Sequence, residues 1–184
     1  MSGYQERDII IFRKIKKGNK KAFDELFYLY YKNLCNYSYY ITNDKFISEE
    51  IVADVFAKIW INRKKISISQ NVKSYLYKST RNTTISYIRK NKNIFCEIEE
   101  DTFLYPAELD TSPEKNIKKE EEQRKIKNLL SVIPERSREV FILHRLNGLK
   151  YSEIADFLDI SVKTVEKHIT KALRILRNNY QKKN

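Results

Sequence analysis

The stretch "YSEIADFLDISVKTVEKHI", residues 151–169, contains two helix starts separated by only four residues, "LDIS". Ser152 can cap a short first helix, and the small side chain of Ala155 allows a second helix to cross it closely. Asp159 can adopt the left-handed conformation that ends the first helix, and Ser161 can cap the second. This spacing predicts a helix-turn-helix.

The second helix of this motif has an apolar side and a basic side. The residues expected to face the core, with Ile160 of the turn, are Val165, Ile169, Ala172, Leu173 and Leu176. In a DNA-binding helix-turn-helix, the first turns of this helix contact base edges in the major groove. The candidate DNA contacts are Ser161, Val162, Lys163, Thr164, Glu166, Lys167 and Lys171.

Helix signals continue upstream of the motif. Ser112 and Pro113 form a helix start, because proline is tolerated at the first helical position. The apolar residues that follow at helical spacing are Ile126, Leu129, Leu130, Ile133, Val140, Phe141, Leu143 and Leu146. Glycine at a helix end permits the left-handed conformation, so we expect the last of these helices to stop at Asn147–Gly148.

The charge is distributed in three blocks. Over the 184 residues, 36 Lys and Arg outnumber 24 Asp and Glu, for a net charge of +12. Residues 1–94 have 19 basic and 8 acidic side chains, residues 95–116 have 1 and 7, and residues 117–184 have 16 and 9. The acidic strip contains two prolines and no sustained apolar period, so it is predicted to be a linker. Two basic domains on a tether suggest a polyanionic partner.

The first block is predicted to be helical. Its first apolar face, with residues three and four apart, comprises Phe23, Leu26, Phe27, Tyr30, Leu34, Tyr37 and Ile41. A second helix is expected to begin at Ser48, with Glu49 and Glu50 at its positive end. Its apolar stripe comprises Ile51, Val52, Val55, Phe56 and Ile59. With only three Gly and three Pro in the chain, the predicted fold is all-α, with two small helical domains.

The segment "NVKSYLYKSTRNTTISYIRKNK", residues 71–92, interleaves tyrosines with lysines and arginines. Aromatic rings can stack on exposed bases while the cations contact phosphates. Tyrosine is also common at half-buried helix positions, with Lys and Arg on the solvated side, so this composition alone leaves both interpretations open.

Other function classes lack their sequence signals. No run of about 18 apolar residues and no signal peptide is present, so a cytoplasmic protein without membrane insertion is expected. His144 and His168 are the only histidines, and no nucleophile, metal or phosphate-loop motif accompanies them, so no enzyme, metal or cofactor is expected. Cys35 and Cys96 are interpreted as free thiols.

Both halves together resemble the extracytoplasmic-function (ECF) group of sigma-70-type RNA polymerase sigma factors. "AFDELFYLYYKNLCNYSYYI", "EEIVADVFAKIW" and "NVKSYLYKSTRNTTISYIRK" are similar to region 2. "LLSVIPERSREVFILHRLNGLKYSEIADFLDISVKTVEKHITKALRILR" is similar to region 4. The part "ISVKTVEKHI" alone is equally similar to the output domain of LuxR-type regulators, so the order of the two halves carries the resemblance.

The resemblance implies a promoter-specificity subunit that is not an enzyme and that acts when bound to core RNA polymerase. The helix "EEIVADVFAKIW" would dock on the clamp helices of the beta-prime chain, with Glu50, Asp54 and Phe56 as candidate contacts. Family members commonly have Gln where this chain has Ala53, so a polar contact is missing there. The beta subunit, promoter DNA and a membrane-bound anti-sigma factor are further implied partners.

The resemblance also implies DNA contacts at two promoter elements. The single-stranded -10 element would be captured by Tyr75, Lys78, Arg81, Asn82, Tyr87 and Lys90. Tyr75 stands where the family usually has tryptophan. The region 4 helix-turn-helix would bind the -35 element, and the acidic linker would pass near the polymerase active-site cleft. The alternative function is a helix-turn-helix regulator that needs no polymerase.

Overall fold

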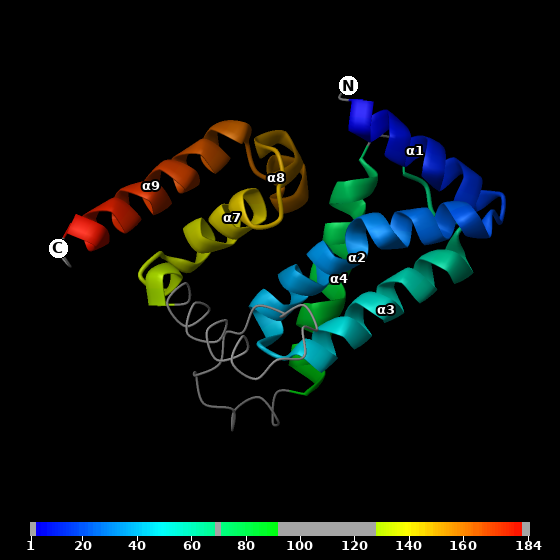
Figure 1. The fold of residues 1–184 in the computed structure, drawn as a ribbon, viewed down its shortest axis with the longest axis horizontal. Coiled ribbons are helices and arrows are strands. Elements are labelled where there is room, and N and C mark those ends of the chain that lie inside the picture. The colour runs from blue at the N-terminus through cyan, green and yellow to red at the C-terminus, as the bar shows by residue number, and fades with distance from the viewer. Residues whose placement is uncertain (1–2, 69–70, 92–127, 182–184) are drawn as a thin grey trace, which may run out of the picture. The chain divides into compact units, whose positions relative to one another are not determined.

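The computed structural model describes residues 3–68, 71–91 and 128–181, in which every regular element is a helix (Figure 1). The chain divides into two compact units, residues 1–99 and 100–184. These observations confirm the all-α prediction. The predicted linker at 95–116 and the helix start at Ser112–Pro113 lie outside the described residues, so the predicted domain boundaries stay a prediction.

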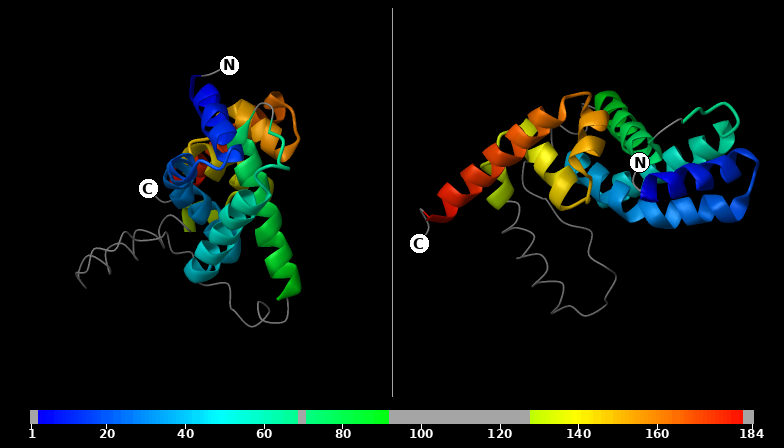
Figure 2. Two further views of the ribbon diagram at one scale, coloured as in Figure 1. Left: turned by 90° about the vertical axis from the view of Figure 1, so that its right-hand side faces the viewer. Right: turned by 90° about the horizontal axis from the view of Figure 1, so that it is seen from above.

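The described residues of the first unit form four helices, which Figure 2 shows from two further sides: α1 (Gly3–Lys16), α2 (Lys20–Thr42), α3 (Lys45–Asn62) and α4 (Val72–Lys90). Three of them begin in the same way. Asn19, Asp44 and Asn71 each accept a hydrogen bond from a backbone amide three residues on, at 3.0, 2.9 and 2.9 Å. Each cap satisfies an amide that has no partner within its helix.

The start of α3 corrects a prediction. Asp44 caps the helix, and Ser48 lies one turn inside it. The Ser48 side chain is buried and donates a hydrogen bond to the carbonyl of Asp44 at 2.6 Å. A serine hydroxyl can bond to a carbonyl four residues earlier as well as cap a helix, so sequence alone did not distinguish the two roles.

Apolar faces of α2, α3 and α4 form the core of the first unit. The predicted stripe of α3 is confirmed, since Ile51, Val52, Val55, Phe56 and Ile59 are all at most 3% exposed. On α2, Leu26, Leu34 and Tyr37 are fully buried, and Tyr37 contacts Tyr77 of α4 with ring centroids 5.5 Å apart. Cys35 is a buried free thiol, in agreement with the sequence interpretation.

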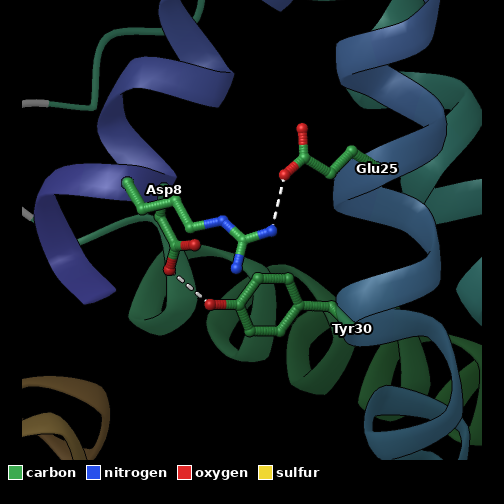
Figure 3. Close-up of polar contacts among 4 residues, drawn as sticks. Asp8, Glu25 and Tyr30 are labelled. Atoms are coloured by element: carbon green, nitrogen blue, oxygen red, sulfur yellow. Dashed lines mark hydrogen bonds and ion pairs between the residues drawn. The ribbon is translucent and has the colours of Figure 1, made fainter. Parts of the chain in front are cut away.

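The helix α1, which was not among the predicted elements, packs along α2. Arg7 forms an ion pair with Glu25 at 2.7 Å, and Tyr30 donates a hydrogen bond to the buried carboxylate of Asp8 (Figure 3). The apolar residues Ile11, Phe12 and Ile15 are at most 3% exposed. These contacts hold α1 on the rest of the unit.

The second unit contains α7 (Glu135–Arg145), α8 (Tyr151–Leu158) and α9 (Val162–Gln181). Its fully buried residues include Ile133, Leu143, Ile154 and Val165. Gly148 has φ +65, so the predicted glycine stop after the helix that carries Val140 and Leu143 is confirmed. Of the upstream apolar residues, Leu130 and Ile133 are buried, Leu129 is 43% exposed, and Ile126 lies outside the described part of the chain.

Candidate functional site

The turn between α8 and α9 has the predicted geometry. Asp159 ends α8 with φ 56 and ψ 49, in the left-handed region, and its amide donates to the carbonyl of Ala155. The side-chain oxygen of Ser161 accepts a hydrogen bond from the amide of Thr164 at 3.1 Å, which caps α9. The predicted left-handed residue and the predicted second cap are therefore both confirmed.

The start of α8 differs from the prediction. The helix begins at Tyr151 after Lys150, and the Lys150 amide donates to the side chain of Glu153 at 2.8 Å. Ser152 is an exposed residue within the first turn, so it is not the cap. The Glu153 carboxylate reaches back to the amide of the residue before the helix, which is one of the two hydrogen bonds of a capping box.

The first half of α9 presents a polar and basic face. Its core-facing residues are Val165, Ile169 and Ala172, each at most 4% exposed, as predicted. Leu173 is 43% exposed and Leu176 is half-buried, so the predicted buried stripe narrows toward the C-terminus. Of the candidate DNA contacts, Thr164 is half-buried and the exposed ones are Ser161, Val162, Lys163, Glu166, Lys167 and Lys171.

Two histidine hydrogen bonds connect α7 to neighbouring parts of the second unit. Nδ1 of His168 on α9 lies 3.0 Å from the hydroxyl of Ser137 on α7. Nδ1 of His144 lies 2.9 Å from the carbonyl oxygen of Leu149, so this nitrogen is the donor. The histidines therefore fix α7 to α9 and the turn before α8.

In the first unit, a cavity of about 400 Å³ lies between α3 and α4. It is lined by Val55, Lys58, Ile59, Asn62, Ile66, Tyr75, Ser79, Asn82 and Thr83. Two candidate -10 residues, Tyr75 and Asn82, are thus brought to one cavity. Lys58, Asn62 and Ile66 were not predicted as site residues, because they become neighbours of α4 only when the two helices pack.

The remaining candidate -10 residues lie on α4 outside the cavity lining. Lys78 and Lys90 are exposed, and Arg81 and Tyr87 are half-buried. Tyr77, one of the three interleaved tyrosines, is fully buried against Tyr37. Its ring therefore packs inside the protein and is not available to stack on a base.

One face of α3 is exposed along its whole length. Phe46 is 81% and Ile61 is 72% exposed at its two ends, with Glu50, Ala53, Asp54 and Ala57 also exposed between them. We call these six residues the α3 stripe. Asp54 forms an ion pair with Lys58 at 2.5 Å. Sequence reasoning missed Phe46 and Ile61, although both share helical spacing with Glu50 and Asp54.

Phe56, the third candidate polymerase contact, does not belong to the α3 stripe. It is 2% exposed and packs against Phe27 and Phe23, with ring centroids 5.0 and 6.0 Å apart. The expectation of a direct contact through Phe56 is corrected, because its ring is part of the aromatic core beneath the stripe.

Residues 3–68, 71–91 and 128–181 contain neither a metal-binding cluster nor a membrane-spanning helix. This part of the chain has no group of three or more His, Cys, Asp or Glu side chains placed to hold a metal ion. None of its helices is long and apolar enough to cross a membrane.

Comparison with known families matches both units. Residues 26–94 match sigma-70 region 2, and residues 123–176 match sigma-70 region 4. The chain is 25% identical to the ECF RNA polymerase sigma factor SigW of Bacillus subtilis over 172 residues, which cover 90% of this chain and 92% of SigW. It is 27% identical to the ferric citrate uptake sigma factor FecI of Escherichia coli over 130 residues, covering 70% and 73% of the two chains.

Solved structures share the fold. CnrH, solved in complex with the cytosolic domain of CnrY, matches with a TM-score of 0.70 at 19% identity, covering 96% of this chain and 99% of CnrH. The sigma factor RpoE of Bartonella quintana, solved with the anti-sigma factor NepR, matches with a TM-score of 0.65 at 19% identity, covering 88% and 98%. With regions 2 and 4 in this order, the chain belongs to the ECF group of sigma-70-type RNA polymerase sigma factors, which are transcription initiation factors and not enzymes.

Proposed function

We propose that this sigma factor binds core RNA polymerase through the α3 stripe, captures a -10 base in the cavity between α3 and α4, and contacts the -35 element with α9. The single observation that carries this proposal is the pairing, in one chain, of that cavity in region 2 with the exposed basic face of α9 in region 4. These two sites suit single-stranded and duplex DNA, respectively.

The α3 stripe suits a protein partner. Phe46 and Ile61 are large apolar side chains, and their burial against a partner would contribute favourable free energy to binding. The carboxylates of Glu50 and Asp54 can pair with cations of the partner. The middle of the α3 stripe has the small side chains of Ala53 and Ala57, so another helix can approach the α3 backbone closely there. The clamp helices of the beta-prime subunit are the proposed partner, with the beta subunit also in contact in the holoenzyme.

The cavity suits a base taken out of the stack. Its volume of about 400 Å³ lies in the range of small-ligand pockets. Asn62 and Asn82 offer amide donors and acceptors, and the ring of Tyr75 offers a stacking surface. Lys78, Arg81 and Lys90 then contact the flanking phosphates, and Tyr87 stacks on a neighbouring base.

Region 4 supplies the duplex contacts. Lys163 can donate to guanine or to phosphate, and Glu166 can accept from cytosine N4. Ser161, Val162, Thr164, Lys167 and Lys171 complete the proposed -35 surface. The acidic linker is proposed to pass near the active-site cleft of the polymerase. The cytoplasm, where polymerase works, is the proposed location.

An inhibitory partner is also proposed. RpoE of Bartonella quintana was solved in complex with the anti-sigma factor NepR. A protein that covers the α3 stripe or the α9 face would prevent polymerase or promoter binding. A membrane-bound anti-sigma factor is the form proposed for this chain.

The test is footprinting and promoter opening with and without core polymerase. Promoter fragments are first selected from a random library with wild-type holoenzyme. Protection and strand opening that require both the chain and the core support the proposal. Tight, sequence-specific protection by the free chain at physiological salt contradicts it and supports the polymerase-independent regulator.

A further inference from the structure

A cluster of cations at the turn between α1 and α2 is not used by the proposed promoter contacts. Six of the nine residues from 13 to 21 are basic, namely Arg13, Lys14, Lys16, Lys17, Lys20 and Lys21. We call them the turn cluster. No acidic residue occurs between Asp8 and Asp24, and no member of the turn cluster forms an ion pair within the described part of the chain.

The positions of Lys20 and Lys21 oppose the helix dipole. Cations in the last turn of α1 are favourable there, because the C-terminal end of a helix is partially negative. Lys20 and Lys21, however, lie in the first turn of α2, which contains no acidic residue. Cations at the positive end of a helix reduce its stability. A bound anion would relieve this repulsion.

The turn cluster is held next to the segment that leads to the cavity. Phe23, in the first turns of α2, contacts Trp60 at the end of α3, with ring centroids 5.1 Å apart. The Arg63 guanidinium lies 4.5 Å from the Trp60 ring centroid and donates to the Trp60 carbonyl at 2.6 Å. Lys64 and Lys65 follow and are exposed.

The same segment then enters the cavity. Amides of Lys65 and Ile66 donate to the carbonyl of Asn62 at 2.8 and 3.1 Å, which fixes this turn. Both Asn62 and Ile66 line the cavity. The turn cluster and the basic residues 63–65 are therefore connected through the Phe23–Trp60 contact, and residues 63–65 lie in the chain between two residues that line the cavity. The contacts of Figure 3 anchor α1 to α2.

We infer that the turn cluster, continued by Arg63, Lys64 and Lys65, binds the phosphodiester backbone of promoter DNA beside the α3–α4 cavity. This inference rests on the proposed function, since capture of a base in the cavity brings the adjoining backbone to these cations at high effective concentration. An anionic membrane is a poorer fit. The apolar side of α1 with Ile11, Phe12 and Ile15 is buried in the core and cannot insert into lipid.

The experiment measures the salt dependence of promoter binding by holoenzyme that contains the variant K20Q/K21Q. Each lost phosphate contact lowers the slope of log affinity against log salt by about 0.7 to 0.9. We expect the slope to decrease by about 1.5, which corresponds to roughly 30-fold weaker binding at 0.1 M salt. The matched control is K32Q/K45Q, which removes the same charge from the same unit at residues outside the turn cluster and should retain the wild-type slope.

Each outcome has one meaning. Since the substitutions remove cations from the positive end of α2, the variant should unfold at the same or a higher denaturant concentration than wild type, so weaker DNA binding does not reflect unfolding. A wild-type slope for K20Q/K21Q overturns the inference, and so does a loss of binding to phosphatidylglycerol vesicles without a loss of DNA binding. Failure of the wild-type holoenzyme to open any promoter would instead contradict the proposed function.

Discussion

The ring of Phe56 on α3 packs 5.0 Å from the ring of Phe27 on α2, on the buried side of the helix whose exposed side carries Asp54. Asp54 and Phe56, two of the three candidate polymerase contacts, are only two residues apart but therefore have different environments. Phe56 supports the α3 stripe from the core, whereas Asp54 lies on its surface. This separation allows stability and polymerase binding to be tested with different variants.

Replacing Phe56 with alanine should destabilise the first unit. Removing a buried phenylalanine ring leaves a cavity and costs about 3–5 kcal/mol. We expect an earlier unfolding transition by circular dichroism in denaturant. Phe46→Ala is the matched control, because the Phe46 ring is 81% exposed and should be replaceable with little loss of stability. Equal stability of both variants would contradict the assignment of Phe56 to the core.

Reversing the charge of Asp54 should weaken association with core polymerase and leave the fold intact. The Asp54–Lys58 ion pair is exposed, and such pairs contribute at most about 1 kcal/mol. Pull-down by immobilised core measures the effect of Asp54→Arg. Asp24→Arg makes the same charge change at an exposed residue of α2. If immobilised core polymerase binds Asp54→Arg to the same extent as Asp24→Arg and wild type, the α3 stripe is not the polymerase contact.

The helices and their buried faces were largely predictable, whereas the surfaces were less so. Residues such as Ile51, Val55 and Val165 repeat at helical spacing, and that spacing depends only on the local backbone. Phe46 and Ile61 are exposed, but Phe and Ile are also the residue types found in the core. Residue type alone therefore did not identify these two as surface residues. Their exposure is decided by which face of α3 packs on α2 and α4.

Two further differences have local causes. Ser48 and Ser152 were expected to cap helices, but Asp44 caps α3 by accepting from the Ile47 amide, and at the start of α8 Glu153 accepts from the Lys150 amide. Several polar residues stood close enough to each helix start to act as the cap. The α3–α4 cavity could not be predicted either, because Asn62 and Asn82 become neighbours only through tertiary packing.

Asp159 should be replaceable by glycine or asparagine but not by alanine. Its φ of 56 lies in the left-handed region, where a residue with Cβ and no compensating polar side chain is less stable by about 1–2 kcal/mol. Denaturant unfolding should rank Asp159→Ala below wild type, with Asp159→Gly and Asp159→Asn close to wild type. An alanine variant as stable as the asparagine variant would show that this turn tolerates other conformations.

The thiol of Cys35 should resist alkylation in the folded protein. Burial raises the pKa of Cys35 to about 12, with a smaller contribution from Glu49, against an opposing hydrogen bond from Tyr31. The reactive thiolate is therefore scarce at pH 8, and the reagent has little access. In a Cys96→Ser background, we expect iodoacetamide to react about 100-fold more slowly than after unfolding in urea. Equal rates in the two states would indicate that α2 is not packed as described.

Lys163 and Lys167 should affect promoter binding in different ways. They are four residues apart on the exposed side of α9, with Glu166 beside Lys167 and Val165 buried beneath. Lys163 lies nearer the leading turn, where base edges are contacted, and Lys167 lies one turn further along. We therefore expect Lys163 to recognise a base of the -35 element and Lys167 to contact a phosphate.

Selection of promoters from a randomised -35 library, with holoenzyme containing each variant, measures both effects. Lys163→Ala should relax preference at one -35 position, with a loss of about 1–3 kcal/mol for the preferred base. Lys167→Ala should weaken all promoters alike and lower the salt slope by about one unit, since only a phosphate contact is lost. Arg177→Ala, an exposed cation near the far end of α9, serves as the control. If both lysine variants retain the wild-type -35 preference and the wild-type salt slope, α9 does not contact DNA through this face.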